Sequence, residues 1–353
     1  EYIEEQIGVE QFLQEIGDEL RRQEYCPQPV LRCWIDKPGT DQKRPLGIPI
    51  IRDRVAQMAA KLILEPIFET NFLDCSYGFR PERDQHKAIA AIDNAITFGK
   101  MRIAIDADIV GYFNNIRHDL LIKLVERRVS DQRVVRLIRA WLKAGVMNDG
   151  VYEEAGETGT PQGGVLSPLL SNIYLHSFDK MFQMSGIEGV LVRYADDFVI
   201  LVKDAGERVL ERIRVMLKRL DLQLHPEKTR IVDVHEGFDF LGMHIRLRPV
   251  KKRNSRLKES CRFWPSKKAI TRMKENVRKI IGRQYSCSLE EMIRKLNPAI
   301  RGWNNYQTRN RWARTGNRMF NGLNWFVRDR LRIFLKRKYS PSTRGTRKLS
   351  DDL

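Results

Sequence analysis

The chain has 353 residues, 42% of them hydrophobic and 31% charged, with a formal net charge of +18. This composition indicates a folded protein of two or three compact units, and it excludes a disordered chain. No apolar run approaches the roughly 20 residues that cross a bilayer, and the five scattered cysteines favour a reducing cytoplasmic setting over a disulfide framework.

The first half of the chain predicts a mixture of helices and strands. Apolar residues at helical spacing predict helices over residues 11–24, 53–72, 84–98, 118–128 and 131–144. The second of these helices begins at Asp53, a residue type that caps helices. Runs of β-branched and other apolar residues predict strands over residues 30–35, 46–51 and 101–109.

The second half predicts a hairpin, more strands and a helical end. A glycine-rich loop over residues 160–164 leads into a helix that starts near Ser167-Pro168. Two strands, 190–194 and 198–202, flank Ala195-Asp196-Asp197 and predict a β-hairpin with acids at its tip. A helix is predicted over residues 205–220, followed by two strands over 230–234 and 240–245 and a charged loop over 246–258. Three helices follow, over residues 267–282, 289–306 and 320–338. We expect an α+β fold, an antiparallel sheet backed by helices, with a domain boundary near residue 250.

The charge is concentrated at the C-terminal end of the chain. Residues 246–348 hold 31 Lys and Arg against 5 Asp and Glu, whereas residues 1–245 are slightly acidic. Packing so much like charge together destabilises a fold unless a polyanion neutralises it. Nucleic acid and an acidic membrane are both candidates for that polyanion.

Three carboxylates stand where strands are predicted to end. Asp108 closes one strand, and Asp196 and Asp197 form the hairpin tip. Clustered acids repel each other, so a shared cation would lower the cost of folding. Oxygen ligands suit Mg²⁺, and two such ions can clamp the attacking and leaving oxygens of a phosphoryl transfer. Asp106 faces the same side of its strand and competes with Asp108 for this role, and an Asp-Asp pair alone is also common in plain turns.

Several sequence blocks together resemble those of reverse transcriptases encoded by group II introns. Tyr194-Ala195-Asp196-Asp197 resembles the Tyr-x-Asp-Asp box of that family. The other blocks occur in the family's order along nearly the whole chain, and they begin at Arg44, Ser76, Asp108, Gly159, Pro226, Phe240 and Leu296. The resemblance implies a right-hand polymerase, with fingers and N-terminal extension over residues 1–100, a palm over 101–250, and a basic helical thumb or maturase domain over 251–353.

The family resemblance also implies a role for particular residues. Asp108, Asp196 and the carbonyl of Ile109 would bind two Mg²⁺ ions, with Mn²⁺ as an alternative, and Asp197 would be a supporting acid. The residues expected to contact the incoming nucleotide are Lys37, Arg44, Phe113, Gln162 and Lys228. Phe113 would reject a 2′-hydroxyl, and Lys228 would protonate pyrophosphate. RNA contacts are expected from Arg301, Trp303, Arg309 and Arg311.

The resemblance predicts an RNA-directed DNA polymerase that acts on an RNA template, a DNA primer and deoxynucleoside triphosphates. It also predicts group II intron RNA as a partner in a cytoplasmic, nucleoid-associated ribonucleoprotein, with a homodimer as one assembly. The N-terminal block resembles a truncated form, and no nuclease motif follows the thumb. Two alternatives stay open: a non-enzymatic RNA chaperone for splicing, and a domesticated relative attached to a CRISPR or phage-defence system.

Overall fold

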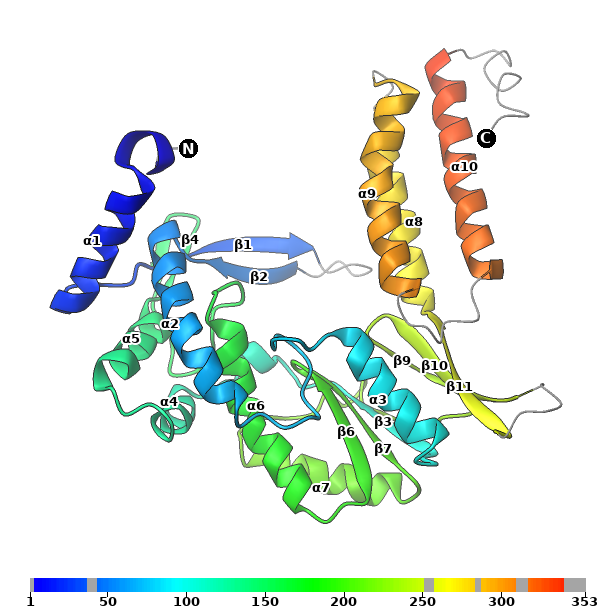
Figure 1. The fold of residues 1–353 in the computed structure, drawn as a ribbon, viewed down its shortest axis with the longest axis horizontal. Helices are drawn as coiled ribbons and strands as arrows, with labels where there is room; N and C mark the ends of the chain where they lie inside the picture. Colours follow the sequence, from blue (N-terminus) through cyan, green and yellow to red (C-terminus); the bar gives the residue numbers. More distant parts are fainter. Residues whose placement is uncertain (1–2, 37–42, 251–256, 283–286, 309–316, 340–353) are drawn as a thin grey trace. The chain divides into compact units, whose positions relative to one another are not determined.

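A computed structural model describes residues 3–36, 43–250, 257–282, 287–308 and 317–339 (Figure 1). The chain falls into two compact units. One comprises Glu1–Ile92 with Ile105–Ile231, and the other comprises Asp93–Ala104 with Val232–Leu353. Within the described ranges, no helix combines the length and apolar character needed to cross a membrane.

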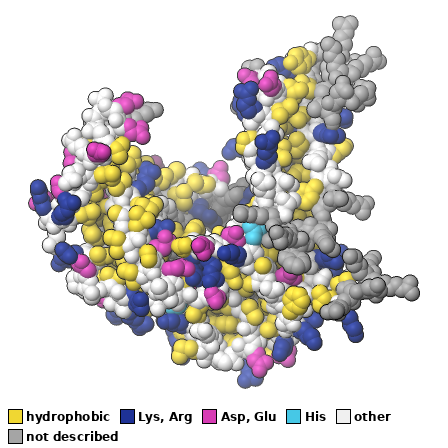
Figure 2. Space-filling view, viewed as in Figure 1, with side chains coloured by type: hydrophobic (Ala, Val, Ile, Leu, Met, Phe, Trp, Pro, Cys, Tyr) yellow, Lys and Arg dark blue, Asp and Glu magenta, His cyan; other side chains and the backbone are white. Residues whose placement is uncertain are grey.

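The helices before residue 220 lie close to where the apolar spacing predicts them. A short π-helical turn (Ile3–Ile7) and a 3₁₀ turn (Tyr112–Asn114) accompany them. The α-helices are α1 (Val9–Arg22), α2 (Ile51–Glu69), α3 (Gln85–Thr97), α4 (His118–Glu126), α5 (Gln132–Lys143), α6 (Ser167–Met184) and α7 (Gly206–Lys218). Hydrophobic side chains face solvent along α1 and α2 (Figure 2), among them Val9, Leu13, Met58, Leu62 and Ile63.

The prediction that Asp53 caps α2 is wrong. The helix begins at Ile51, so Asp53 lies within its first turn and is buried. Its carboxylate accepts hydrogen bonds from the hydroxyl of Tyr25 (2.6 Å) and the backbone N–H of Gln28 (3.0 Å). A buried carboxylate is tolerated because these donors replace water. Asp53 therefore fastens the segment after α1 to α2.

A four-stranded sheet of order β2-β1-β4-β5 follows α1. Its strands are β1 (Val30–Asp36), β2 (Lys43–Ile48), β4 (Val146–Asn148) and β5 (Val151–Glu153). β1 pairs antiparallel with β2, and its start pairs parallel with β4. The second strand was predicted over residues 46–51, but Ile50 and Ile51 instead cap and begin α2. The sequence also does not predict β4 and β5, because three residues are too few for a period to register.

The second sheet carries the predicted hairpin. Its order is β6-β7-β3-β8, built from β6 (Gly189–Tyr194), β7 (Asp197–Val202), β3 (Ile103–Ala107) and β8 (Arg230–Asp233). β6 and β7 pair antiparallel in the register Val192↔Val199. In β7 every residue from Phe198 onward is buried, and Phe198 packs on Phe178 of α6 with ring centroids 5.2 Å apart. This apolar packing fixes the hairpin against α6.

The three-stranded sheet of the second unit corrects another prediction. Residues 246–258 were expected to be a charged loop, but β10 (Met243–Pro249) continues through Arg246 and Arg248. It pairs antiparallel with β11 (Glu259–Pro265) and with β9 (Phe238–Phe240). Alternate side chains of β10 and β11 are buried, which is the strand period, while the arginines between them stay more open. Their charge concealed the strand from sequence inspection.

Three helices complete the second unit: α8 (Lys267–Ile281), α9 (Leu289–Thr308) and α10 (Asn317–Tyr339). They confirm the three predicted C-terminal helices. They lie side by side, and α8 packs against both others (Figure 1). Met273, Val277, Leu296, Leu323 and Phe334 are among the buried side chains of their shared core.

Candidate active site

The hairpin tip holds the two adjacent acids. Tyr194 pairs with Asp197 as the last rung of the β6–β7 ladder, which leaves Ala195 and Asp196 as a two-residue turn. Ala195 has a φ of 57°, a left-handed conformation that residues with a Cβ seldom adopt. The surrounding structure must therefore hold this turn in place.

Asp108 lies one residue beyond β3, the strand next to β7 in the sheet. The segment after α7 runs beside it: His225 N–H donates to the Asp108 carbonyl (2.7 Å), and Ile109 pairs with Leu224. The ammonium Nζ of Lys228 lies 2.6 Å from Asp108 Oδ2. Asp108 thus has a fixed backbone and a carboxylate that already attracts a cation.

The pKa shifts of the hairpin acids show that the three predicted acids interact. Burial, and then the charge of Asp108, raise the pKa of Asp196 above its ordinary value. The pKa of Asp197 is raised to about 6, first by desolvation and then by the charges of Asp196 and Asp108. Solvent still reaches part of that side chain. Asp108, just beyond β3, is the acid outside the hairpin that acts on both. Two positive charges, Lys228 first and then Arg44, oppose the rise at Asp197.

The donor chemistry suits a hard divalent cation. Across the described ranges, no group of three or more His, Cys, Asp or Glu side chains is arranged to enclose an ion by itself. Mg²⁺ typically takes one or two carboxylates and completes its shell with water and substrate phosphates. Asp108 and Asp196 with the carbonyl of Ile109 offer that kind of partial set, and the Lys228 ammonium shows that positive charge is stabilised there.

The glycine-rich loop lies against the β2 strand. Gly47 N–H donates to the carbonyl of Gln162 at 2.7 Å. A Cβ on Gly163 would lie 2.9 Å from the Gly47 carbonyl oxygen, and the φ of Gly163 is +120°, so only glycine fits. The side-chain Oε1 of Gln162 is buried and has no hydrogen-bond partner within the described structure. The described structure therefore leaves this acceptor unsatisfied.

The remaining predicted nucleotide contacts occupy different surroundings. Phe113 is partly buried on the 3₁₀ turn and packs edge-on against Tyr112, with ring centroids 5.2 Å apart. Its carbonyl accepts the N–H of Thr160 at 2.8 Å, which ties it to the glycine-rich loop. Arg44 is exposed on β2. Lys37 lies outside the described residues.

The predicted RNA contacts of the second unit differ in their exposure. Arg301 is exposed on α9, but Trp303 is partly buried and packs against Phe320 at 5.7 Å as part of the helical core. Arg309 and Arg311 lie outside the described residues. Trp325 on α10 is an exposed aromatic residue, with 66% of its surface accessible. Helical spacing from the exposed Arg328, Arg332 and Lys336 could have identified it.

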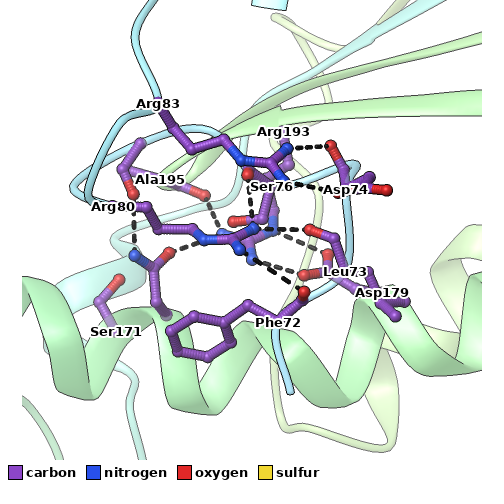
Figure 3. A network of polar contacts seen from close by, with 12 residues as sticks. Phe72, Leu73, Asp74, Ser76, Arg80, Arg83, Ser171, Asp179, Arg193 and Ala195 are labelled. Carbon is purple, nitrogen blue, oxygen red and sulfur yellow. Dashed lines mark hydrogen bonds and ion pairs between the residues drawn. The ribbon is translucent and has the colours of Figure 1, made fainter. Parts of the chain in front are cut away.

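Sequence inspection also missed Arg193. It is a single charged residue inside the otherwise apolar strand β6, immediately before the Tyr-x-Asp-Asp box, and it is fully buried. Its guanidinium is held by Asp179 and Asn172 of α6 (Figure 3). A charge in the centre of a buried strand is a signal in itself, because such a group requires a built partner.

The chain matches known families over most of its length. Residues 35–245 match the family described as reverse transcriptase (RNA-dependent DNA polymerase), and residues 270–350 match the group II intron, maturase-specific domain. The chain is 37% identical to Protein YkfC of Escherichia coli (strain K12), over 71% of this chain and 74% of that protein. It is 33% identical to the group II intron-encoded protein LtrA of Lactococcus lactis subsp. cremoris, over 71% of this chain and 52% of LtrA.

A solved structure shares the fold. Telomerase from Candida albicans, determined in complex with a fragment of telomeric RNA, superposes with a TM-score of 0.51 at 11% identity, covering 95% of this chain and 66% of that one. The fold is that of the right-hand polymerases, as predicted. The chain belongs to the reverse transcriptase family, the RNA-dependent DNA polymerases, and within it to the group II intron-encoded type that carries a maturase domain. It spans about half the length of LtrA.

Proposed function

We propose that the chain copies an RNA template into DNA at Asp108, Asp196 and Asp197, with two Mg²⁺ ions and deoxynucleoside triphosphates. The supporting observation is the gathering of these carboxylates, whose mutual charge and burial raise the pKa of Asp196 and of Asp197. Folding tolerates such repulsion at a site built to receive cations. Mn²⁺ is the alternative ion.

The reaction follows from this assignment. The 3′-hydroxyl oxygen of the primer attacks the α-phosphorus of the nucleotide, a phosphodiester bond forms, and the bond to pyrophosphate breaks. The ions, when bound, supply charge stabilisation for the attacking and leaving oxygens. Lys228 donates a proton to the leaving pyrophosphate, while the proton of the primer hydroxyl passes to water. Asp197 supports Asp196, and Phe113, Gln162, Arg44 and Lys37 position the nucleotide.

A sulfur substitution tests whether metal ions contact the reacting phosphate. The two diastereomers of a deoxynucleoside α-thiotriphosphate replace different non-bridging oxygens with sulfur, which binds hard Mg²⁺ poorly and softer Mn²⁺ better. We expect one diastereomer to be incorporated slowly with Mg²⁺ and to recover with Mn²⁺, whereas the all-oxygen nucleotide shows no such switch. Equal slowing of both diastereomers with either ion would contradict a metal contact at the α-phosphate.

A second activity, RNA binding in splicing, is favoured by the second unit. It matches the maturase-specific domain, and α10 presents the exposed residues Trp325, Arg328, Arg332 and Lys336. Stacking and phosphate contacts from such a surface fit RNA. We propose that group II intron RNA is the partner, in a cytoplasmic ribonucleoprotein. The predicted nucleoid association and homodimer stay predictions.

The double variant Asp196→Asn/Asp197→Asn separates the two activities. We expect it to bind intron RNA and to promote splicing while DNA synthesis is lost, because the acids lie on the palm hairpin and not on the helical unit. Splicing lost together with synthesis, in a variant that keeps its thermal unfolding temperature, would contradict independent roles. A neighbourhood of CRISPR or phage-defence genes in place of an intron would favour the domesticated reading.

A further inference from the structure

A buried guanidinium lies directly behind the acidic turn. Arg193 is 0% exposed, and so is the side chain of its ion-pair partner Asp179. Arg193 Nε and Nη2 donate to the two carboxylate oxygens of Asp179 at 2.8 and 2.5 Å. Nη1 donates to Asn172 Oδ1 (3.1 Å) and to the carbonyl of Ala195 (3.0 Å) (Figure 3). The fork thus joins α6 to the left-handed residue of the turn.

The planar guanidinium of Arg193 fixes the directions of its hydrogen bonds. Guanidinium presents its donors in a rigid plane, so a bidentate carboxylate on one edge fixes where the other edge points. Here the opposite edge points to the Ala195 carbonyl. A buried ion pair often contributes little net stability compared with apolar packing. Its position behind the turn suggests that it is retained to hold that turn in place.

A second segment also packs against the turn. The N–H of Arg193 donates to the Cys75 carbonyl (2.7 Å), and Tyr77 N–H donates to the Arg193 carbonyl (2.8 Å), so the backbone near Ser76 runs alongside β6. Asn172 Nδ2 donates to the carbonyl of Gly78 at 2.8 Å. Asn172 therefore bonds both the guanidinium and this segment.

Gly78 approaches the turn closely. A Cβ on Gly78 would collide with the backbone nitrogen of Ala195 and would lie 3.0 Å from the carbonyl carbon of Tyr194. The φ of Gly78 is not in the left-handed region, so the position excludes a side chain through lack of space alone. Backbone therefore packs directly on backbone next to Asp196.

The segment that carries Gly78 is itself anchored. Arg80 is 7% exposed and donates to Glu69 Oε1 (2.6 Å), to the carbonyl of Leu73 (2.6 Å) and to the carbonyl of Ser76 (2.8 Å). These bonds tie the loop back to the end of α2 (Figure 3). The contact at Gly78 is thus backed by a second buried arginine.

We propose that Arg193, Asp179, Asn172 and Gly78 form a tip brace that sets the position of the Ala195–Asp196 turn relative to Asp108. They are positioning residues, since they act on Asp196 through the backbone of the turn. The inference rests on the proposed metal-dependent polymerisation at the acids. Loosening the brace should lower the turnover number and raise the Mg²⁺ concentration needed for half-maximal synthesis, more than it changes the KM for nucleotide.

Gly78→Ala is the sharpest variant, because the added methyl can only push against the turn. Gly17→Ala is the matched control, since a Cβ at Gly17 in α1 meets only the end of the Arg21 side chain at 3.9 Å. We expect Gly78→Ala to lower kcat by about tenfold or more, and to raise the half-saturating Mg²⁺ concentration several-fold. Gly17→Ala should match the wild type. An unchanged kcat and Mg²⁺ dependence in Gly78→Ala would overturn the brace.

Asn172→Ala gives a second test that leaves the Arg193–Asp179 pair intact. Amide hydrogen exchange in a peptide over residues 190–200 should quicken in Asn172→Ala and in Gly78→Ala but not in Gly17→Ala, and Mn²⁺ binding to the protein alone should weaken. A lower unfolding temperature with unchanged exchange and Mn²⁺ binding would mean a structural role only, and would refute the proposal. If the wild type makes no DNA but the two variants still show faster exchange than the wild type, the proposed function is refuted and the brace stands.

Discussion

His176 shows how one buried side chain links stability to pH. It lies on α6, packs edge-on against Phe72 at 5.5 Å, and both ring nitrogens are buried without a hydrogen-bond partner within the described structure. Burial lowers the pKa of this imidazole to about 4. The folded protein therefore keeps His176 neutral where the unfolded chain, with a pKa near 6.5, takes up a proton.

The sign of the resulting pH dependence follows directly. The contribution of His176 to the free energy of unfolding is complete above pH 6.5 and is lost as pH falls toward 4, by up to about 3 kcal/mol. We predict that His176→Leu removes this part of the acid destabilisation. Urea unfolding from pH 7 to pH 4 measures it, with a variant of the half-buried His86 as control. Parallel pH curves for the wild type and His176→Leu would contradict the prediction.

Arg193 illustrates what sequence reasoning at single positions can and cannot supply. The acids were predictable because several motif blocks occurred in order, each with a residue type suited to metal chemistry. The brace was not, because Asp179, Asn172 and Gly78 lie far from Arg193 in sequence and have no shared pattern. Asp53 failed as a cap for a similar reason: its partners Tyr25 and Gln28 lie in the segment between α1 and β1.

At the scale of elements, α9 carries a core tryptophan and α10 carries a surface one. Trp303 packs with Phe320, whereas Trp325 is exposed. We predict that Trp303→Ala lowers the free energy of unfolding by about 2–3 kcal/mol, a little less than a fully buried aromatic residue would cost. Trp325→Ala should leave stability unchanged and weaken RNA binding by about 1–3 kcal/mol, the contribution of one stacked base.

Thermal unfolding and RNA titration of both tryptophan variants test this pair. The reverse pattern, with Trp303→Ala folded normally but deficient in RNA binding, would restore the sequence-based assignment of Trp303 to the RNA contact. Trp303 received the RNA assignment because it lies in the block beginning at Leu296, which resembles the family's maturase or thumb region. Only the packing of α9 against its neighbours distinguishes them.

The helices and strands themselves were predicted unevenly. Long amphipathic helices such as α5 and α8 were located to within about a residue. The structure adds their N-caps, Asp131 and Ser266, whose side chains accept backbone hydrogen bonds. β11 was missed because it is a short strand beside the charged stretch that was expected to be a loop, and β4 and β5 because they are too short. Tertiary pairing, not local preference, forms these strands.

Over the whole molecule, the charge division between residues 1–245 and 246–348 governs how RNA is held. The strongly basic part should release counterions on binding, so the logarithm of the affinity should fall linearly with the logarithm of salt concentration. With about six phosphate contacts, affinity should fall by roughly 10³-fold between 50 and 200 mM salt. Filter binding across that range measures the slope. A flat response would contradict an electrostatic RNA surface.

The most direct test of the account is primer extension on poly(rA)/oligo(dT), comparing the wild type, Asp196→Asn and Asp204→Asn. Asp204 is an exposed acid soon after the same hairpin, so it controls for the loss of a negative charge. We expect Mg²⁺-dependent DNA synthesis by the wild type and Asp204→Asn, and a loss of at least about 100-fold in Asp196→Asn. Equal synthesis by all three proteins would contradict the placement of the active site at the hairpin tip.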